Sequence, residues 1–549
     1  MPTNHNSPRF TPIVIAVSLV GGILIGTFLT TRFATNRLSI INSSSNKIND
    51  LLHIIDDRYV DTIGIAQVVE RALPTLLSEL DPHSSYIPAE EAEEANQELR
   101  GSFSGIGVQF TINNDTVYIS NVIHAGPAEK SGVIAGDRII AINGNPYVGD
   151  SVSNKETMKR LRGEKGTDVS ITVLRGGEEH CITITRDDIP VSTIDAAYML
   201  TPQLGYIRVS SFGETTYVEL LNALLSLQVE GFKGLVIDLR DNGGGYLGAA
   251  VQMINEFLPD HKLIVYTEGR KSKRQEYHTD GRGSYQSLPL IILTNEYTAS
   301  AAEIFAGAIQ DNDRGIIVGR RTFGKGLVQE AIDFPDGSLI HLTIARYYTP
   351  SGRCIQKPYE QGRGEEYQME ILNRYQHGEY FHSDSIHQQG EAFSTSIGRT
   401  VYGGGGIMPD YFVPEDTSLV TPWFTDCIRL GYLTEFCFNY TDQHRAALYP
   451  HNTVERLLRH LKTQGITQQF IQFCDQKNMR RRNNQILKSQ PLIEQTLYAR
   501  IIYNMLDMEA YLQYTNQQDS TVLRAIQLYQ QGSTRPQLPP SSAPGDSID

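Results

Sequence analysis

The sequence predicts a multidomain α/β protein with an inserted, mostly-β module, an N-terminal transmembrane helix and a helical C-terminal region. Three observations lead to this fold class. Strand-like and helix-like segments alternate between residues 190 and 350, short strands with glycine turns fill residues 101–187, and helical spacing dominates after residue 413. A chain of 549 residues is also too long for a single hydrophobic core.

The first segment, residues 1–36, contains an apolar stretch. Residues 11–31 carry no charge, and at about 1.5 Å per helical residue they are just long enough to cross a hydrocarbon layer of about 30 Å. No small-x-small cleavage site follows, so we expect a retained signal anchor rather than a removed signal peptide. The flanking Arg9, Arg32 and Arg37 do not decide its orientation.

Three folded segments follow in order. Helical spacing predicts a connector over residues 37–100, which ends at the turn "DPHSSYIP". Residues 101–187 form the mostly-β module, whose size is sufficient to fold alone. Residues 188–412 form the α/β core, because continuous apolar runs such as 235–239 and 288–293 are typical of strands buried on both faces.

The remaining chain is predicted to be a helical region, residues 413–530, and a disordered tail, residues 531–549, which has few apolar side chains to bury. Apolar positions such as Leu497, Ile501, Leu506 and Met508 follow helical spacing. Packing on the core is the default role of these helices, and homo-oligomerisation or binding of an adaptor are the alternatives.

Composition excludes some function classes. The net charge of −14 argues against nucleic acid as the main partner, because phosphate binding needs a concentrated basic face. Five cysteines without CxxC spacing indicate neither a zinc site nor a disulfide framework, and we expect no metal and no cofactor. A bridge between Cys427 and Cys437 would fit an oxidising compartment, with free buried thiols as the alternative.

Two segments place candidate catalytic groups at the ends of predicted strands. "DLRDNGGG", residues 238–245, ends a strand with three glycines, whose N–H groups can face a ligand, although an ordinary turn has the same composition. In "LTNEYTASAAEIFAGAIQ", Ser300 stands between a strand and a helix, and the N–H of Ala301 is free to hold an oxyanion. Serine is also a preferred helix N-cap, so Ser300 alone does not establish a nucleophile.

Lys325 in "RRTFGKGLVQ" favours the nucleophile. It stands between two glycines and near Phe323 and Leu327, and a lysine base must be neutral near pH 7. Moving a lysine pKa from ~10.4 to ~7 costs roughly 4 to 5 kcal/mol, which apolar burial can impose. Gln329 can orient the amine without adding a charge, so a Ser-Lys dyad is chemically coherent.

These motifs, together with "LDPHSSYI" and "GRTVYGGGGIMPD", resemble the C-terminal processing peptidases, which are tail-specific serine proteases of the S41 family, over residues ~40 to 412. The resemblance implies a crotonase/ClpP-like α/β protease core. It also implies roles for individual residues: Ser300 as the nucleophile, Lys325 as the general base, Gln329 as its orienter, and the amides of Ala301 and Gly245 as oxyanion donors.

The mostly-β module resembles a PDZ domain. "FSGIGVQF" is similar to the PDZ loop that binds a chain terminus, in which the N–H groups of Gly105, Ile106 and Gly107 hold a carboxylate. Met158 and Leu161, three residues apart on a predicted helix, line the pocket for the last side chain of a peptide or belong to the ordinary core. The implied partners are polypeptides with accessible C-termini.

Together these expectations describe a serine endopeptidase, anchored in the inner membrane by residues 11–31, with its catalytic part on the periplasmic or extracytoplasmic side. A catalytically silent PDZ scaffold is one alternative. An acyl-transfer enzyme of the crotonase type is another, although no adenine or pantetheine site is recognisable. Related S41 enzymes of the tricorn type use a histidine base, and His278 and His341 are the candidates for that role that mutation would test.

Overall fold

The computed structural model describes residues 38–92, 101–113, 115–150, 152–386 and 390–537. The chain divides into two compact units, residues 1–77 and 78–549. The first contains α2 (Leu38–Arg58) and α3 (Ile65–Ser78), which is amphipathic. The membrane span predicted over residues 11–31 lies outside the described part. Within that part, no helix combines the length and apolar character that crossing a bilayer requires.

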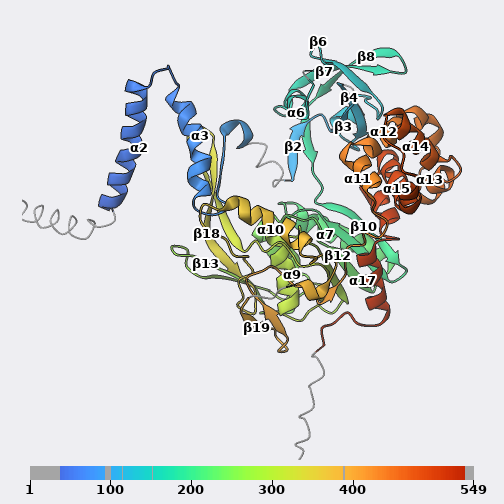
Figure 1. The fold of residues 1–549 in the computed structure, drawn as a ribbon. Helices are drawn as coiled ribbons and strands as arrows, with labels where there is room; N and C mark the ends of the chain where they lie inside the picture. Colours follow the sequence, from blue (N-terminus) through green and yellow to red (C-terminus); the bar gives the residue numbers. More distant parts are fainter. Residues whose placement is uncertain (1–37, 93–100, 114, 151, 387–389, 538–549) are drawn as a thin grey trace, which may run out of the picture. The chain divides into compact units, whose positions relative to one another are not determined.

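The second unit contains the predicted mostly-β module (Figure 1). Five of its strands form one sheet in the order β3-β4-β5-β7-β8, with β6 added to β5, while β2 pairs with β9. Val117, Ile119 and Ile139 alternate along their strands and are fully buried, as a half-buried antiparallel sheet requires. The elements are β2 (Ser102–Gly105), β3 (Val108–Asn113), β4 (Thr116–Val122), α5 (Pro127–Lys130), β5 (Arg138–Ile142), β6 (Asn145–Pro146), α6 (Asn154–Leu161), β7 (Asp168–Arg175), β8 (Glu178–Thr185) and β9 (Asp187–Pro190).

A six-stranded sheet forms the predicted α/β core, in the order β10-β11-β12-β15-β16-β21. From β11 to β21 its strands are parallel, and every residue of β12 and β15 is buried, as the continuous apolar runs predicted. The strands are β10 (Ile194–Thr201), β11 (Leu204–Val209), β12 (Gly234–Asp238), β15 (Leu290–Thr294), β16 (Ile316–Gly319) and β21 (Tyr411–Phe412).

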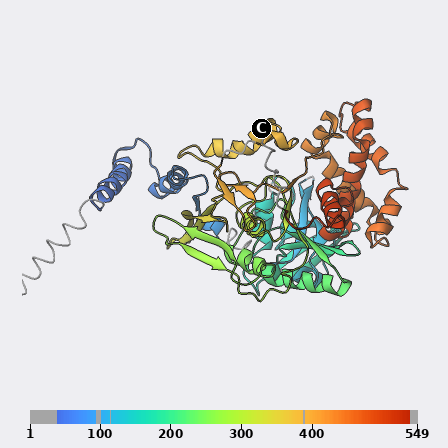
Figure 2. The same cartoon turned by 90° about the horizontal axis from the view of Figure 1, so that it is seen from below.

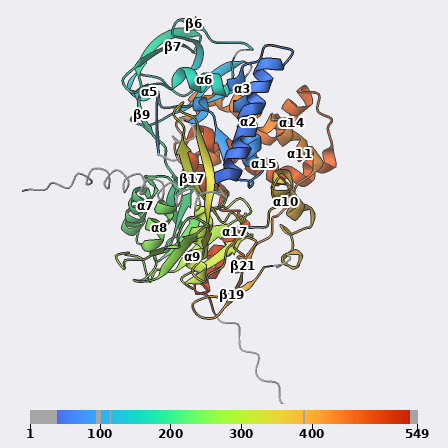
Figure 3. The same cartoon turned by 90° about the vertical axis from the view of Figure 1, so that its left-hand side faces the viewer.

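Helices cover both faces of this sheet. One face packs on α7 (Thr216–Glu230), α8 (Leu247–Asn255) and α9 (Ala301–Asp311). The other packs on two C-terminal helices, α16 (Met508–Thr515) and α17 (Ser520–Gln530), through Leu512, Val522 and Leu528. Figure 3 shows α7, α8 and α9 on one side and α17 on the other. Helices α16 and α17 thus pack on the core, as the default prediction expected for the whole C-terminal region, whereas the helices that precede them do not.

A second, antiparallel sheet lies beside the first. Its order is β1-β18-β13-β14, and β17 pairs with β18 in antiparallel orientation. The strands are β1 (Ser85–Ile87), β13 (Leu263–Glu268), β14 (Gln275–His278), β17 (Leu327–Asp333) and β18 (Leu339–Tyr348). The polar segment after β18 contains α10 (Gly364–Gln376), the 3₁₀ turn η1 (Ser383–Ser385), and the hairpin of β19 (Ala392–Ser394) and β20 (Thr400–Tyr402).

Five further helices, coloured orange to red in Figures 1 and 2, have their own hydrophobic core. They are α11 (Pro422–Arg429), α12 (Tyr432–Leu448), α13 (Val454–Leu461), α14 (Ile466–Gln476) and α15 (Asn483–Met505). Leu497 and Ile501 are fully buried there, whereas Met508 is 38% exposed. Residues 538–549 of the predicted tail lie outside the described residues, and Thr534 is buried.

All five cysteines are free thiols. The bridge considered between Cys427 and Cys437 does not form, because Cys427 lies against Cys474 instead. Helical packing brings these two residues together across α11 and α14, a contact that the sequence spacing did not indicate.

Candidate active site

Ser300 lies at the turn between β15 and α9. Its backbone has φ 56° and ψ −118°, a conformation that a non-glycine residue adopts only when its surroundings enforce it. Every residue of α9 is buried, so the turn is held by a rigid helix. Ala301 is the first residue of that helix, and its N–H has no acceptor one helical turn earlier.

The glycine turn at residues 243–245 lies directly beside this serine. It follows β12, and because β12 and β15 are neighbouring parallel strands, their carboxyl ends meet at one edge of the sheet. A Cβ added to Gly244 would stand 2.7 Å from the Ser300 Cβ, so only glycine permits this approach. Phe212 fixes the turn by donating its N–H to Gly244 O (2.9 Å) and accepting from the N–H of Tyr246 (2.7 Å).

Gly245 also occupies a glycine-only conformation. Its φ is 139°, and an added Cβ would meet Phe212 O at 2.2 Å. Its N–H donates to no described carbonyl. The amides proposed from the sequence as oxyanion donors, those of Gly245 and Ala301, therefore border the same cleft as Ser300.

Lys325 reaches this cleft from the loop between β16 and β17. Its ammonium donates to Gln329 Oε1 at 2.9 Å, which is the contact that the four-residue spacing predicted. Burial lowers the pKa of Lys325, while the carboxylates of Glu303 and Asp81 oppose the decrease. Burial outweighs the two charges, so the amine is shifted toward the neutral form that a general base requires.

Glu303 joins the serine and the lysine, a role that the sequence did not reveal. Its fully buried carboxylate accepts four hydrogen bonds: from Ser300 N (2.9 Å), Lys325 N (2.8 Å), Gly324 N (2.8 Å) and Thr322 Oγ1 (2.5 Å). Burial raises the pKa of Glu303 to about 7 although these donors favour the charged form. In the sequence, Glu303 looks like an ordinary acidic residue in the first turn of a helix.

Tyr347 makes a second link between the two segments. Its buried hydroxyl lies 2.5 Å from Lys325 O and 3.1 Å from Ser300 O. Glu303 and Tyr347 together fix the backbones of Ser300 and Lys325 relative to each other. Glu303 accepts hydrogen bonds from the N–H groups of both residues, and the Tyr347 hydroxyl binds the carbonyls of both.

The connector motif "LDPHSSYI" holds the orienting glutamine. Gln329 Nε2 donates to the carbonyl of His83, and Thr343, the partner of Gln329 on β18, donates its hydroxyl to Asp81 (3.1 Å) and its N–H to Ser84 Oγ (3.1 Å). Burial, and next the charge of Lys325, lower the pKa of His83 to about 4, so its imidazole is neutral near pH 7. The sequence identified this motif only as a family hallmark.

One cleft of ≈ 700 Å³ is lined by Ser300, Lys325, Gln329 and Tyr347, and also by His341. Burial, with the nearby charge of Lys325, lowers the pKa of His341. His278 lies outside the cleft, on the exposed strand β14 beside Glu276 (3.7 Å). Of the two candidate histidine bases, only His341 therefore borders the cleft with Ser300.

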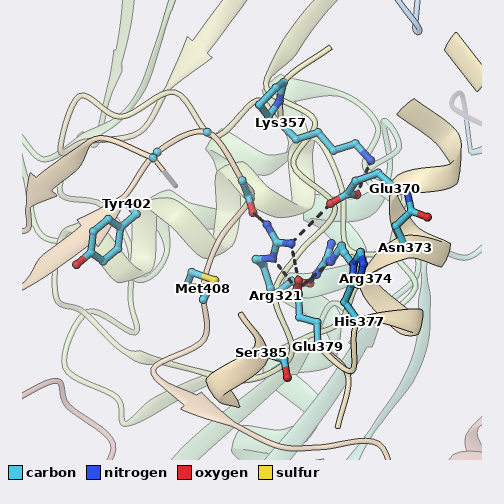
Figure 4. A pocket seen from close by; sticks show the side chains of 16 residues that line it. Arg321, Lys357, Glu370, Asn373, Arg374, His377, Glu379, Ser385, Tyr402 and Met408 are labelled. Atoms are coloured by element: carbon cyan, nitrogen blue, oxygen red, sulfur yellow. Dashed lines mark hydrogen bonds and ion pairs between the residues drawn. The ribbon is translucent and has the colours of Figure 1, made fainter. Parts of the chain in front are cut away.

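A cluster of ion pairs supports the loop that carries Lys325 (Figure 4). Glu379 binds both Arg321 (2.7 Å) and Arg374 (2.8 Å), and Arg374 donates to the carbonyls of Arg321 (2.8 Å) and Thr322 (3.1 Å). These side chains line a cavity of ≈ 360 Å³, which is also lined by the glycine run 403–406. Directly after this run, Ile407 N donates to Thr322 Oγ1 (2.6 Å). The late motif "GRTVYGGGGIMPD" thus packs behind the loop of the candidate base.

The predicted carboxylate-binding loop of the β-module has two N–H groups, those of Ile106 and Gly107, that donate to no described carbonyl. Gly105 belongs to β2, and Gly107 has φ 78°. The two candidate pocket residues have different surroundings. Met158 lines a cavity beside β3, whereas Leu161 belongs to the core of the module.

Within the described residues no group of three or more histidine, cysteine or acidic side chains is arranged to hold a metal ion.

Comparison with known proteins identifies the family of this chain. Residues 203–362 match the model of peptidase family S41, residues 104–185 match the PDZ domain, and residues 423–507 match a family of unknown function (DUF8443). A probable CtpA-like serine protease of Staphylococcus aureus (strain N315) is 32% identical over 353 residues, which are 63% of this chain and 70% of that protein. The chain belongs to the C-terminal processing serine peptidases of family S41.

Other members of the family match similar portions. A carboxy-terminal-processing protease of Bartonella bacilliformis is 36% identical over 317 residues, covering 56% of this chain and 72% of that protein. The solved photosystem II D1 C-terminal processing protease is 26% identical, with a TM-score of 0.34 and coverage of 67% of this chain and 92% of that one.

Proposed function

We propose that this S41 peptidase is a serine endopeptidase that hydrolyses peptide bonds with a Ser300–Lys325 dyad and recognises polypeptide C-termini through its PDZ domain. The observation that carries the proposal is the hydrogen bond of 2.9 Å between Lys325 and Gln329 in the cleft that Ser300 borders. Burial favours a neutral Lys325, and a neutral amine can accept a proton from the serine hydroxyl.

The reaction follows from these groups. Lys325 Nζ takes the hydroxyl proton as Ser300 Oγ attacks the carbonyl carbon of the scissile bond, and the N–H groups of Gly245 and Ala301 stabilise the oxyanion. Lys325 then returns the proton to the leaving amine, which leaves an acyl-enzyme. A water molecule, deprotonated by Lys325, attacks the ester, and the proton passes back to Ser300 as the acid product leaves.

Substrate capture is assigned to the PDZ domain. The N–H groups of Ile106 and Gly107 bind the terminal carboxylate, and the tail adds as a strand to β3, which lies at the edge of its sheet. We further propose that residues 11–31 anchor the chain in the inner membrane with the catalytic part on its outer side, where secreted and envelope proteins present their C-termini. A reporter of export fused to the C-terminus tests this orientation.

The test of the activity is cleavage of a peptide with an apolar free C-terminus by the full chain, read by mass spectrometry. Cleavage is expected from the parent and from His278→Ala, but not from Ser300→Ala or Lys325→Ala, and amidation of the peptide C-terminus should slow it. Tight binding with no cleavage by any variant would instead identify a PDZ scaffold. Full activity of Lys325→Ala combined with loss in His341→Ala would assign the base to His341.

A further inference from the structure

The strand that the PDZ domain offers to a substrate tail has an open side. β3 stands at the edge of the order β3-β4-β5-β7-β8, so one row of its backbone groups has no neighbouring strand in that sheet. Such an edge is a template for an added strand. A cavity of ≈ 500 Å³ runs along Val108–Thr111 of β3, with Asn154 and Met158 of α6 on one side.

The second wall of this cavity belongs to the C-terminal helices. Thr434, Cys437 and Phe438 of α12 line it together with Arg500, Tyr503 and Asn504 of α15. Binding cavities for ligands usually measure about 300 to 1,000 Å³, so the space between the two walls is sufficient for several residues of an extended peptide. These six residues lie within the segment that matches the family of unknown function.

Specific contacts attach α12 to the PDZ sheet. Arg138 of β5 forms an ion pair of 2.8 Å with Asp442, and the Tyr118 ring of β4 meets the Phe438 ring edge-on with centroids 4.9 Å apart. At the end of β3, Asn113 donates its side-chain amide to Asn439 Oδ1 (3.1 Å). The helical wall is therefore fixed beside β3 by contacts to three successive strands.

Arg500 is the charged residue of the cavity. The other described residues that line it are neutral, and the exposed Arg500 side chain has neither a hydrogen bond nor an ion pair within the described residues. In a chain with a net charge of −14, an unpaired guanidinium beside a peptide groove is suited to a carboxylate, which it binds through two parallel N–H groups.

Strand geometry indicates which substrate residue meets this wall. Val108, Phe110 and Ile112 pack on the core of the module, so Gln109 and Thr111 point to the opposite face, where Tyr118 contacts α12. A tail paired with β3 alternates in the same way. Its last residue points toward α6, and the residues one and three positions earlier point toward α12 and α15.

We propose that α12 and α15 complete the peptide groove of the PDZ domain, and that Arg500 selects substrates with an acidic side chain one or three residues before the C-terminus. This inference rests on the proposed recognition of C-termini and adds a substrate class to it. The C-terminal helical region is accordingly a specificity element of the protease.

The test measures binding of fluorescent decapeptides by anisotropy to the full chain carrying Ser300→Ala, which prevents cleavage. The peptides have an apolar last residue and Asp or Asn at the position one or three before it, each with a free or amidated C-terminus. Three versions of this chain are compared: one with Arg500 intact, one with Arg500→Gln, and a control with Arg459→Gln. Arg459 is an exposed arginine on α13 that lies outside the cavity.

The proposal expects Arg500→Gln to raise the dissociation constant of an Asp peptide about twofold to fivefold, with the Asn peptides and Arg459→Gln unchanged. The preference for Asp should shrink at high salt. Equal weakening of Asp and Asn peptides, or no effect of Arg500→Gln, would refute the role of Arg500. If amidation has no effect on any peptide, C-terminus recognition itself fails, which is a different outcome from loss of the Asp preference alone.

Discussion

Replacing Gln329 by glutamate tests how the pKa of Lys325 is set. The substitution keeps the shape of the side chain and places a negative charge where Gln329 Oε1 now lies 2.9 Å from Lys325 Nζ. Opposite unit charges at about 4 Å interact with about 4 kcal/mol at an effective dielectric constant of about 20. At about 1.4 kcal/mol per pKa unit this equals about 3 units, which contact of the cleft with water reduces to about 1.5 to 3.

The amine must be neutral to act as the base, so raising its pKa moves the rise of kcat/KM to higher pH by the same amount. At pH 7 the activity of Gln329→Glu should fall roughly 30- to 1,000-fold and recover as the pH is raised. The assay is the pH profile of peptide cleavage from pH 5 to 10. Gln329→Leu also loses the hydrogen bond to His83 but adds no charge, and should lose activity without this upward shift. Identical profiles for both variants would refute the reasoning.

Three further substitutions have defined outcomes. Gly244→Ala should lower activity at least 100-fold, because its Cβ would meet Ser300 at 2.7 Å, whereas Gly248→Ala, with nothing within 4 Å of the new Cβ, should be active. Glu303→Gln offers one acceptor oxygen to four donors, so two buried groups lose partners at about 1 to 3 kcal/mol each, and thermal unfolding should show a lower Tm. Burial raises the pKa of Asp81, but hydrogen bonds from Ser84, His83 and Thr343 outweigh this effect, so the pKa is lower in the folded protein. Ionised Asp81 therefore stabilises the fold above the pKa of the unfolded state, and this stabilisation is lost as pH falls through the lower pKa of the folded state. Asp81→Asn should remove this part of the acid sensitivity in denaturation curves.

Much of the fold follows from periodicity. The apolar runs at 235–239 and 288–293 predicted the buried strands β12 and β15, and the glycine turns predicted the mostly-β module. The distribution of the C-terminal helices was not predictable, because amphipathic helices that pack on the core sheet and those that pack on one another have the same apolar spacing. Leu497 and Leu528 illustrate this, since one belongs to the helical cluster and the other to the sheet.

The candidate site divides in a similar way. Ser300, Lys325 and Gln329 were found because they stand in local motifs with a direct chemical interpretation. Glu303, Tyr347 and His83 were missed, because most of their contacts join them to residues 21 to 246 positions away in the chain. The S-x-x-E spacing of Ser300 and Glu303, which is typical of a capping box, is the local signal that could have identified Glu303. The pairing of β17 with β18, which brings Thr343 and the connector to Gln329, is likewise a long-range event.

The central claim is that Ser300 is a nucleophile activated by Lys325. Its most direct test is labelling with a fluorophosphonate, followed by peptide mapping in the mass spectrometer. The account predicts one adduct on Ser300, formed at a rate that rises with pH and falls at least 100-fold in Lys325→Ala, with no labelling in Ser300→Ala. An adduct on another residue, or unchanged labelling of Ser300 without Lys325, would contradict it.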